Sequence, residues 1–231
     1  MERSLTEQIE VKYDEDRWRL LEKIRSEAYR MIRPLMAHNI QALAYGSVAR
    51  GDVSEGSDID IFIPRPPSPI LIEAIIERSG IISKEREIVQ ATPSYAAKGY
   101  IYVGERRSYS FSMVDPRPVE LEFYGFAGSV DASQVEKGIR VPGVDKRLML
   151  IEPTESGHIE SPVTGREGKI AGILGINVAV VLDRVRTLTR REEIGRTGVF
   201  LNRKLAPDEG FGEVFQELAR QRPALRRRLR M

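Results

Sequence analysis

The motif that most constrains this chain is Gly46-Ser47 followed, after ten intervening residues, by Asp58-Ile59-Asp60. Leu43 to Tyr45, just before the glycine, are typical of the end of a buried strand. The residues after the serine can turn into a short helix whose first backbone N–H groups lack intrahelical partners. Such groups, together with a serine hydroxyl, form a site for an anion such as phosphate. The sequence therefore predicts a strand, a phosphate-binding turn and a short helix.

Asp58 and Asp60 lie in an apolar run that ends at Ile63 and is predicted to be a strand. Side chains at positions i and i+2 of a strand lie on one face, roughly 7 Å apart. Two carboxylates held in this way repel each other unless cations lie between them, and two Mg²⁺ ions about 3.5–4 Å apart are a common solution for displacement at phosphorus. The pattern favours phosphoryl chemistry. The alternative is that both aspartates merely line the solvent face of an edge strand.

Gly-Ser followed about a dozen residues later by Asp-x-Asp, between two strand-like runs, resembles the signature of the nucleotidyltransferase superfamily, which has a polymerase-beta-like fold. The resemblance covers roughly residues 39–126. It implies an α+β fold with a nucleotidyltransferase-type mixed β-sheet flanked by helices, here with an N-terminal helix and a mainly α-helical C-terminal region. It also implies that Gly46, Ser47 and Arg50 bind the nucleotide, and that Asp58 and Asp60 are catalytic metal ligands.

The family also uses a third carboxylate from a later strand, and the segment from Val119 to Phe126 is the candidate for it. Glu120 and Glu122 alternate there with apolar residues, so both are predicted to lie on one face of a strand. Glu122 fits the family's sequence motif better than Glu120 does. It is therefore expected to be the third catalytic and metal-binding carboxylate, with Glu120 as the alternative. A glutamate stands where the family usually has an aspartate.

The resemblance implies an enzyme that moves a nucleoside monophosphate from a nucleoside triphosphate to a hydroxyl acceptor and releases pyrophosphate. Two Mg²⁺ ions are the expected cofactors, and ATP or CTP is the expected nucleotide. Relatives modify RNA 3′ ends, small molecules or protein hydroxyls, and the fold does not choose among these acceptors. Binding of nucleotide or RNA without turnover is a further alternative, because the third carboxylate departs from the family pattern.

The chain from residue 184 onward is strongly basic, although the net charge of the protein is only +2. Such a stretch can neutralise the phosphates of a nucleic acid, so RNA is the expected acceptor and partner. The alternative is a solvated helix face with a basic end. The basic residues concerned are Arg184, Arg186, Arg190, Arg191, Arg196, Arg203, Lys204, Arg220, Arg222, Arg226, Arg227, Arg228 and Arg230.

The character of the chain changes after Phe126, where residues 128–143 are small and polar. We therefore expect a catalytic domain with the N-terminal helix over residues 1–127, and a basic, mainly helical region over residues 128–231. The elements predicted from apolar spacing are helices over 14–36, 70–78, 170–188 and 210–230, the last bent at Pro223, and a hairpin over 99–114.

The sequence offers no sign of export or of a membrane span. No apolar run approaches the roughly 18 residues that a spanning helix needs, and the N-terminus lacks the layout of a signal peptide. The chain has no cysteine, which excludes disulfides, thiolate metal sites and cysteine nucleophiles. These features predict a cytoplasmic enzyme with no membrane contact.

Overall fold

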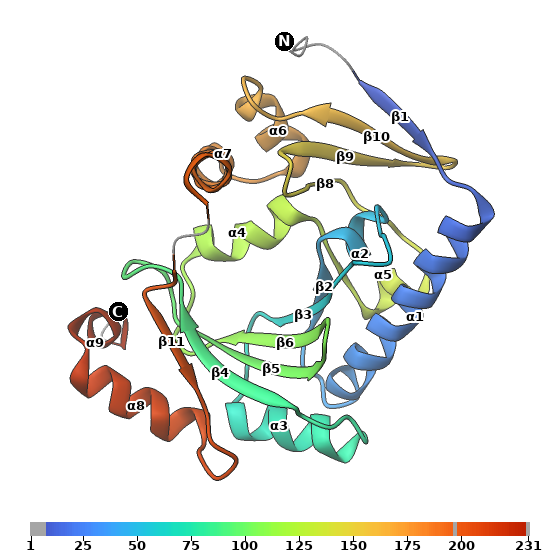
Figure 1. The fold of residues 1–231 in the computed structure, drawn as a ribbon. Helices are drawn as coiled ribbons and strands as arrows, with labels where there is room; N and C mark the ends of the chain where they lie inside the picture. The colour runs from blue at the N-terminus through green and yellow to red at the C-terminus, as the bar shows by residue number, and fades with distance from the viewer. Residues whose placement is uncertain (1–7, 196–197, 230–231) are drawn as a thin grey trace.

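The computed structural model describes residues 8–195 and 198–229, and two β-sheets form their framework (Figure 1). The large sheet has seven strands and is mixed, because β3 and β6 run parallel while the other neighbours are antiparallel. In spatial order its strands are β11 (Leu201–Lys204), β4 (Glu85–Gln90), β5 (Lys98–Gly104), β6 (Arg107–Ser112), β3 (Ile59–Ile63), β2 (Leu43–Tyr45) and β7 (Ser129–Asp131). The α+β fold with a mixed sheet flanked by helices is thus confirmed.

The small sheet is antiparallel and lies on the other side of the short helix α2 (Ser47–Arg50) from the large sheet (Figure 1). It joins the N-terminal strand to three strands from the middle of the chain. In spatial order these are β1 (Ile9–Lys12), β10 (Gly157–Pro162), β9 (Met149–Thr154) and β8 (Gly143–Val144).

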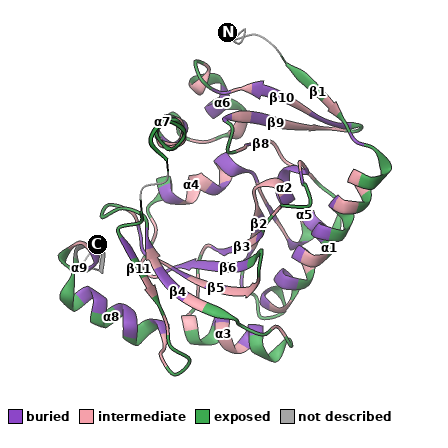
Figure 2. Cartoon of the chain, in the orientation of Figure 1, coloured by how far each residue is buried: buried purple, intermediate pink, exposed green. Residues whose placement is uncertain are grey.

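One face of the large sheet is covered by three helices: α1 (Glu15–Met36), α3 (Pro69–Arg78) and α8 (Phe211–Gln221). The strands bury apolar side chains toward these helices, among them Ile61, Ile101 and Phe111. The ring centroids of Phe111 and Phe211 lie 5.1 Å apart. The main core therefore lies between the sheet and these three helices, along which Figure 2 shows buried residues interspersed with exposed ones.

The predicted helices over 14–36 and 70–78 and the predicted hairpin over 99–114 are confirmed as α1, α3 and the β5–β6 pair. Asp14 caps α1 by accepting a hydrogen bond from the Arg17 backbone N–H at 2.8 Å. The predicted apolar stripe of α1 is buried, from Leu21 to Leu35. Local apolar spacing was sufficient for these elements.

The helix predicted over 170–188 is in fact two helices, α6 (Glu167–Leu174) and α7 (Val178–Ile194). Gly175 ends α6 with a left-handed φ of 63°, and Asn177 caps α7 by accepting from the Ala179 N–H at 2.8 Å. The predicted bend at Pro223 separates α8 from α9 (Pro223–Leu229).

Elements from both sides of residue 127, the expected domain boundary, pair in the two sheets. The later part adds β7 and β11 to opposite edges of the large sheet, and β1 from the start of the chain pairs with β10. The later part also contributes the strands β7 to β11 besides its helices. Apolar residues on both sides of residue 127 share one core.

Candidate active site

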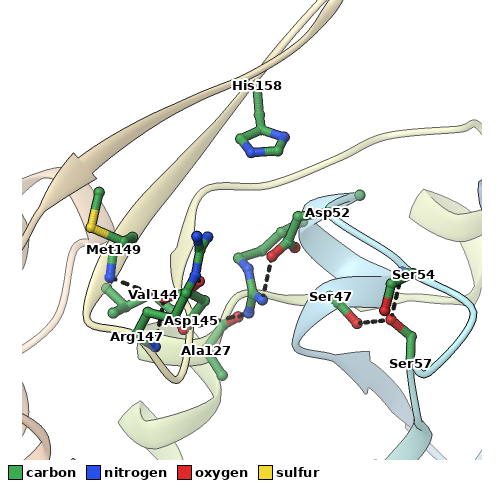
Figure 3. A network of polar contacts seen from close by, with 12 residues as sticks. Ser47, Asp52, Ser54, Ser57, Ala127, Val144, Asp145, Arg147, Met149 and His158 are labelled. Carbon is green, nitrogen blue, oxygen red and sulfur yellow. Dashed lines mark hydrogen bonds and ion pairs between the residues drawn. The ribbon is translucent and has the colours of Figure 1, made fainter. Parts of the chain in front are cut away.

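The Gly46-Ser47 turn joins β2 to α2 and directs the following loop toward β3. Gly46 has a φ of 76°, a left-handed conformation that glycine adopts without steric cost. The Ser47 hydroxyl donates a hydrogen bond to the Ser57 Oγ at 3.2 Å, and that Oγ also accepts from the Ser54 N–H at 2.9 Å (Figure 3). The turn is thereby tied to the residue just before Asp58, so the two halves of the motif meet.

Asp58 immediately precedes β3, and Asp60 lies in β3 in register with Ser108 on the parallel strand β6. Asp58 is exposed, whereas Asp60 is partly buried and accepts a hydrogen bond from the Ser108 hydroxyl at 2.6 Å. Burial raises the pKa of Asp60; the hydrogen bond from Ser108 opposes this rise, and the charge of Asp58 adds to it. The pair is therefore an anionic site whose inner carboxylate resists ionisation.

The expectation that a strand over 119–126 brings a third carboxylate to this pair is wrong, because the segment is helix α4 (Pro118–Ala127). Pro118 occupies the first helical turn, where its missing N–H costs nothing. The Glu120 carboxylate accepts from the Arg117 N–H at 2.7 Å, as the glutamate of a capping box does. Proline two residues before a glutamate was the signal for a helix start.

The carboxylates of α4 have other partners. Glu120 is buried and also accepts from the Ala96 N–H at 2.7 Å, and Glu122 accepts from the Asn177 N–H at 2.6 Å. Among the residues that the structure describes, no group of three His, Cys, Asp or Glu side chains could hold a metal ion. The carboxylate site therefore consists of Asp58 and Asp60, and Ser108 occupies the adjacent position on β6.

Arg50, expected from the motif to bind the nucleotide, has several partners within the protein. Its guanidinium is buried and donates to the Ala127 carbonyl at 2.7 Å, while its other amino group pairs with Asp52 at 2.9 Å. These contacts tie α2 to the end of α4. Arg50 thus holds the loop that follows the Gly-Ser turn.

A tyrosine-rich surface, which the sequence motif does not indicate, lies beside Asp60 on the same face of the large sheet. Tyr102 lies opposite Ser108 and donates to Glu87 at 2.6 Å, and the rings of Tyr100 and Tyr102 stack with centroids 6.1 Å apart. The shared face of the two tyrosines was predicted from their alternation. Their position next to Asp60 was not, because it depends on the register of three strands.

A partly buried amine lies on the same strand as the two tyrosines. The Lys98 ammonium donates to the Tyr124 hydroxyl at 2.8 Å and lies over the rings of Phe62 and Phe123. Burial lowers the pKa of Lys98 to about 8. Hydroxyls, aromatic rings and one amine thus share this face of the sheet with Asp60, and such a surface can hydrogen-bond a polar substrate and stack against its base.

His158 lies in strand β10 of the small sheet. It is buried, with Nδ1 2.6 Å from the Tyr13 hydroxyl and Nε2 3.1 Å from Glu160. Tyr13 also donates to the carbonyl of Gly51 at 3.0 Å. The histidine therefore links the small sheet to the residue that ends α2.

Several of the basic C-terminal residues that the structure describes have partners within the protein. Arg184 lies 5.0 Å from the Phe123 ring centroid, Arg203 pairs with Glu209, and Lys204 pairs with Glu85. Arg196 and Arg230, and the side chains of Arg227 and Arg228, lie outside the described residues. The remaining basic residues are exposed: Arg186, Arg190, Arg191, Arg220, Arg222 and Arg226.

Residues 21–115 match the sequence model of the nucleotidyltransferase domain family. The matched span contains the Gly-Ser turn, the aspartate pair and the β5–β6 hairpin. Residues 21–115 therefore carry a nucleotidyltransferase domain, a class of domain that transfers nucleotidyl groups. No curated protein matches the chain. Among the described helices, none is long and apolar enough to cross a membrane.

Proposed function

We propose that the protein is an enzyme that moves a nucleoside monophosphate from a nucleoside triphosphate to a hydroxyl acceptor and releases pyrophosphate. The observation that carries this proposal is the contact between the Gly-Ser turn and the segment that leads into the aspartate pair. Ser47 in the phosphate-binding turn hydrogen-bonds Ser57, the residue before Asp58. A triphosphate in the turn would thus lie beside the aspartate pair.

The two aspartates fit a Mg²⁺ ion that arrives with the nucleotide. Mg²⁺ is commonly held by one or two carboxylates, water molecules and the phosphates of a substrate. The raised pKa of Asp60, caused by burial and by the charge of Asp58, indicates repulsion that a cation would relieve. When bound, the ion neutralises charge on the phosphates and on the leaving pyrophosphate. Two carboxylates support one such ion better than the two ions expected from the motif.

The chain's own residues then position the reactants. The turn at Gly46 and Ser47 holds the triphosphate, and the surface of Tyr100 and Tyr102 offers the base a stacking face. The acceptor oxygen forms a bond to the α-phosphorus, the bond from that phosphorus to pyrophosphate breaks, and the hydroxyl proton leaves to solvent. Most of the rate gain is expected from holding these groups in line.

RNA is the proposed acceptor, with ATP or CTP as the donor. The exposed arginines of α7 create a positive field that attracts an anionic acceptor at long range, without contacting it directly. A small molecule or a protein hydroxyl is the competing acceptor.

One observation favours a second candidate, nucleotide binding without transfer. Ser108 lies beside Asp60 on the neighbouring strand, where a third carboxylate would complete the site that the family uses. Serine cannot supply the negative charge that favours deprotonation of an acceptor hydroxyl. A protein of this kind would bind nucleotide with Mg²⁺ and release no pyrophosphate.

The test is to incubate the protein and Mg²⁺ with each nucleoside triphosphate labelled at the α-phosphate, together with total cellular RNA. The proposal expects label in RNA and an equal amount of pyrophosphate. Parallel incubations with a small-molecule extract and with protein alone test the competing acceptors. Nucleotide binding without label transfer to any acceptor would contradict the proposal and favour the second candidate.

A further inference from the structure

A groove of about 800 Å³ lies beside the start of β3, on the helix side of the large sheet. Its walls are the C-terminal half of α1, the loop between α3 and β4, and the turn of the β5–β6 hairpin, which lie together in Figure 1. Its volume is in the range of ligand-binding pockets, about 300–1,000 Å³. The groove is separate from the aspartate face.

The groove is basic on both walls. Arg30 and Arg33 line it from α1, and Lys84 and Arg107 line it from the opposite side. Its acidic lining residue is Glu27, which pairs with Arg107 at 2.6 Å. Within the described part of the chain, Arg30, Arg33 and Lys84 have no carboxylate partner. An anionic chain in the groove would therefore meet cations on both sides.

Apolar side chains line the groove between these cations. Met31, Ile81 and Val103 contribute to the lining, and the neighbouring Ile82 is 78% exposed. A ligand with alternating phosphates and flat apolar faces matches this lining better than a free inorganic anion. Single-stranded nucleic acid has these properties, because its backbone follows positive charge while its bases contact apolar surface.

The groove opens at the same end of β3 as Asp58. Arg107 is in register with Ile59 on the adjacent parallel strand, and the Ile59 N–H donates to the Arg106 carbonyl at 2.7 Å. Neighbouring strands are about 4.8 Å apart, so the near wall of the groove is one strand away from the residue that follows Asp58. A single-stranded nucleic acid in the groove can pass around the ends of β-strands β3 and β6 to reach the aspartate pair.

We propose that this groove binds the single-stranded end of the RNA acceptor. The proposal rests on the proposed nucleotidyl transfer and adds the surface that presents the acceptor. It places the acceptor on Arg30, Arg33, Lys84 and Arg107, and not on the arginine-rich C-terminal helices.

The test measures binding of a fluorescent single-stranded RNA oligonucleotide by anisotropy, in EDTA and without nucleotide. The triple variant Arg30→Ser/Arg33→Ser/Lys84→Ser is compared with a matched control, Arg220→Ser/Arg222→Ser/Arg226→Ser, which also removes three exposed cations. The groove variant should lose affinity about tenfold or more and flatten the salt dependence by about two units of slope. The control should stay within about twofold of wild type.

Two further measurements exclude trivial causes. Arg30→Lys/Arg33→Lys keeps the charge and should retain most of the affinity, and thermal melting shows whether each variant is folded. Unchanged RNA affinity in a folded groove variant, a larger loss in the C-terminal control, or equally tight binding of a polyglutamate peptide would overturn the proposal.

Failure of this inference is distinguishable from failure of the proposed function. If wild type transfers label to RNA but the groove variant binds RNA normally, the groove assignment alone is wrong. If RNA binds in the groove but no nucleotide is transferred, the groove assignment holds and the proposed activity is wrong.

Discussion

The surroundings of Asp60 raise the pKa of its carboxyl group. It is partly buried next to Asp58, and the Ser108 hydroxyl is its hydrogen-bond donor at 2.6 Å. Burial favours the protonated form, so a cation or a protonated carboxylate suits this position better than a bare negative charge. A cation bound beside the pair would therefore favour the ionised form of Asp60.

Asp60→Asn should stabilise the metal-free protein at neutral pH. Because the folded pKa of Asp60 is raised, ionisation costs folding free energy. This cost is absent below the unfolded pKa of aspartate, about 3.9, and is complete above the folded pKa. Urea unfolding in EDTA should therefore show the variant more stable than wild type at pH 7 and equally stable at low pH. A variant less stable than wild type at pH 7 would contradict this account of the pair.

Ser108→Ala should move the acid limb of the pH profile. The Ser108 hydrogen bond lowers the pKa of Asp60, so its removal should raise that pKa further and make Mg²⁺-dependent transfer fall off at a higher pH. The measurement is kcat/KM against pH. Ser110→Ala, on the same strand and face, is the control and should leave the limb in place; a Ser108→Ala profile identical to wild type would exclude this role.

Among the elements, α4 shows what sequence patterns can and cannot settle. Its alternation of apolar residues with Glu120 and Glu122 is also typical of a strand, and only Pro118 and the capping glutamate favour the helix. By contrast, α1, α3 and the β5–β6 hairpin were predictable because their signals are local. The tyrosine surface depends on strand register, and register is set by contacts between distant segments.

Substitutions in α4 test the corrected role of its carboxylates. Glu120→Ala should cost about 1–3 kcal/mol of stability, because the N–H groups of Ala96 and Arg117 lose their acceptor. Its kcat per folded molecule should stay near wild type. Glu122→Gln should change neither quantity strongly. Chemical unfolding and steady-state kinetics measure both, and a collapse of kcat in folded Glu122→Gln would restore this residue as the third carboxylate.

At the scale of the whole molecule, strands from the early and late parts of the chain pair with each other. The N-terminal strand β1 completes the small sheet, and β7 and β11 complete the two edges of the large sheet. The motif and its neighbouring elements were predictable from the sequence. The pairing of these edge strands was not predictable. β11 is far from β4 in the sequence, and short edge strands carry little sequence signal.

A fragment of residues 1–127 should therefore fail to fold as an independent domain. It lacks β7 and β11, which leaves the edges of β2 and β4 unpaired, and it loses the core contacts of Val130 and Phe211. Circular dichroism melting of the fragment should show no cooperative transition, whereas the full chain should unfold cooperatively. A cooperative melt of the fragment would show that the boundary at residue 127 is real.

Mg²⁺-dependent pyrophosphate release in aspartate variants tests the central claim most directly. Wild type with nucleoside triphosphate and RNA should release pyrophosphate, and Asp58→Asn and Asp60→Asn should each lower kcat by on the order of a hundredfold or more. Asp208→Asn, an exposed loop substitution, is the control and should leave kcat unchanged. Wild-type rates in both active-site variants, or no Mg²⁺-dependent release from wild type, would contradict the assignment of the aspartate pair as a nucleotidyl-transfer site.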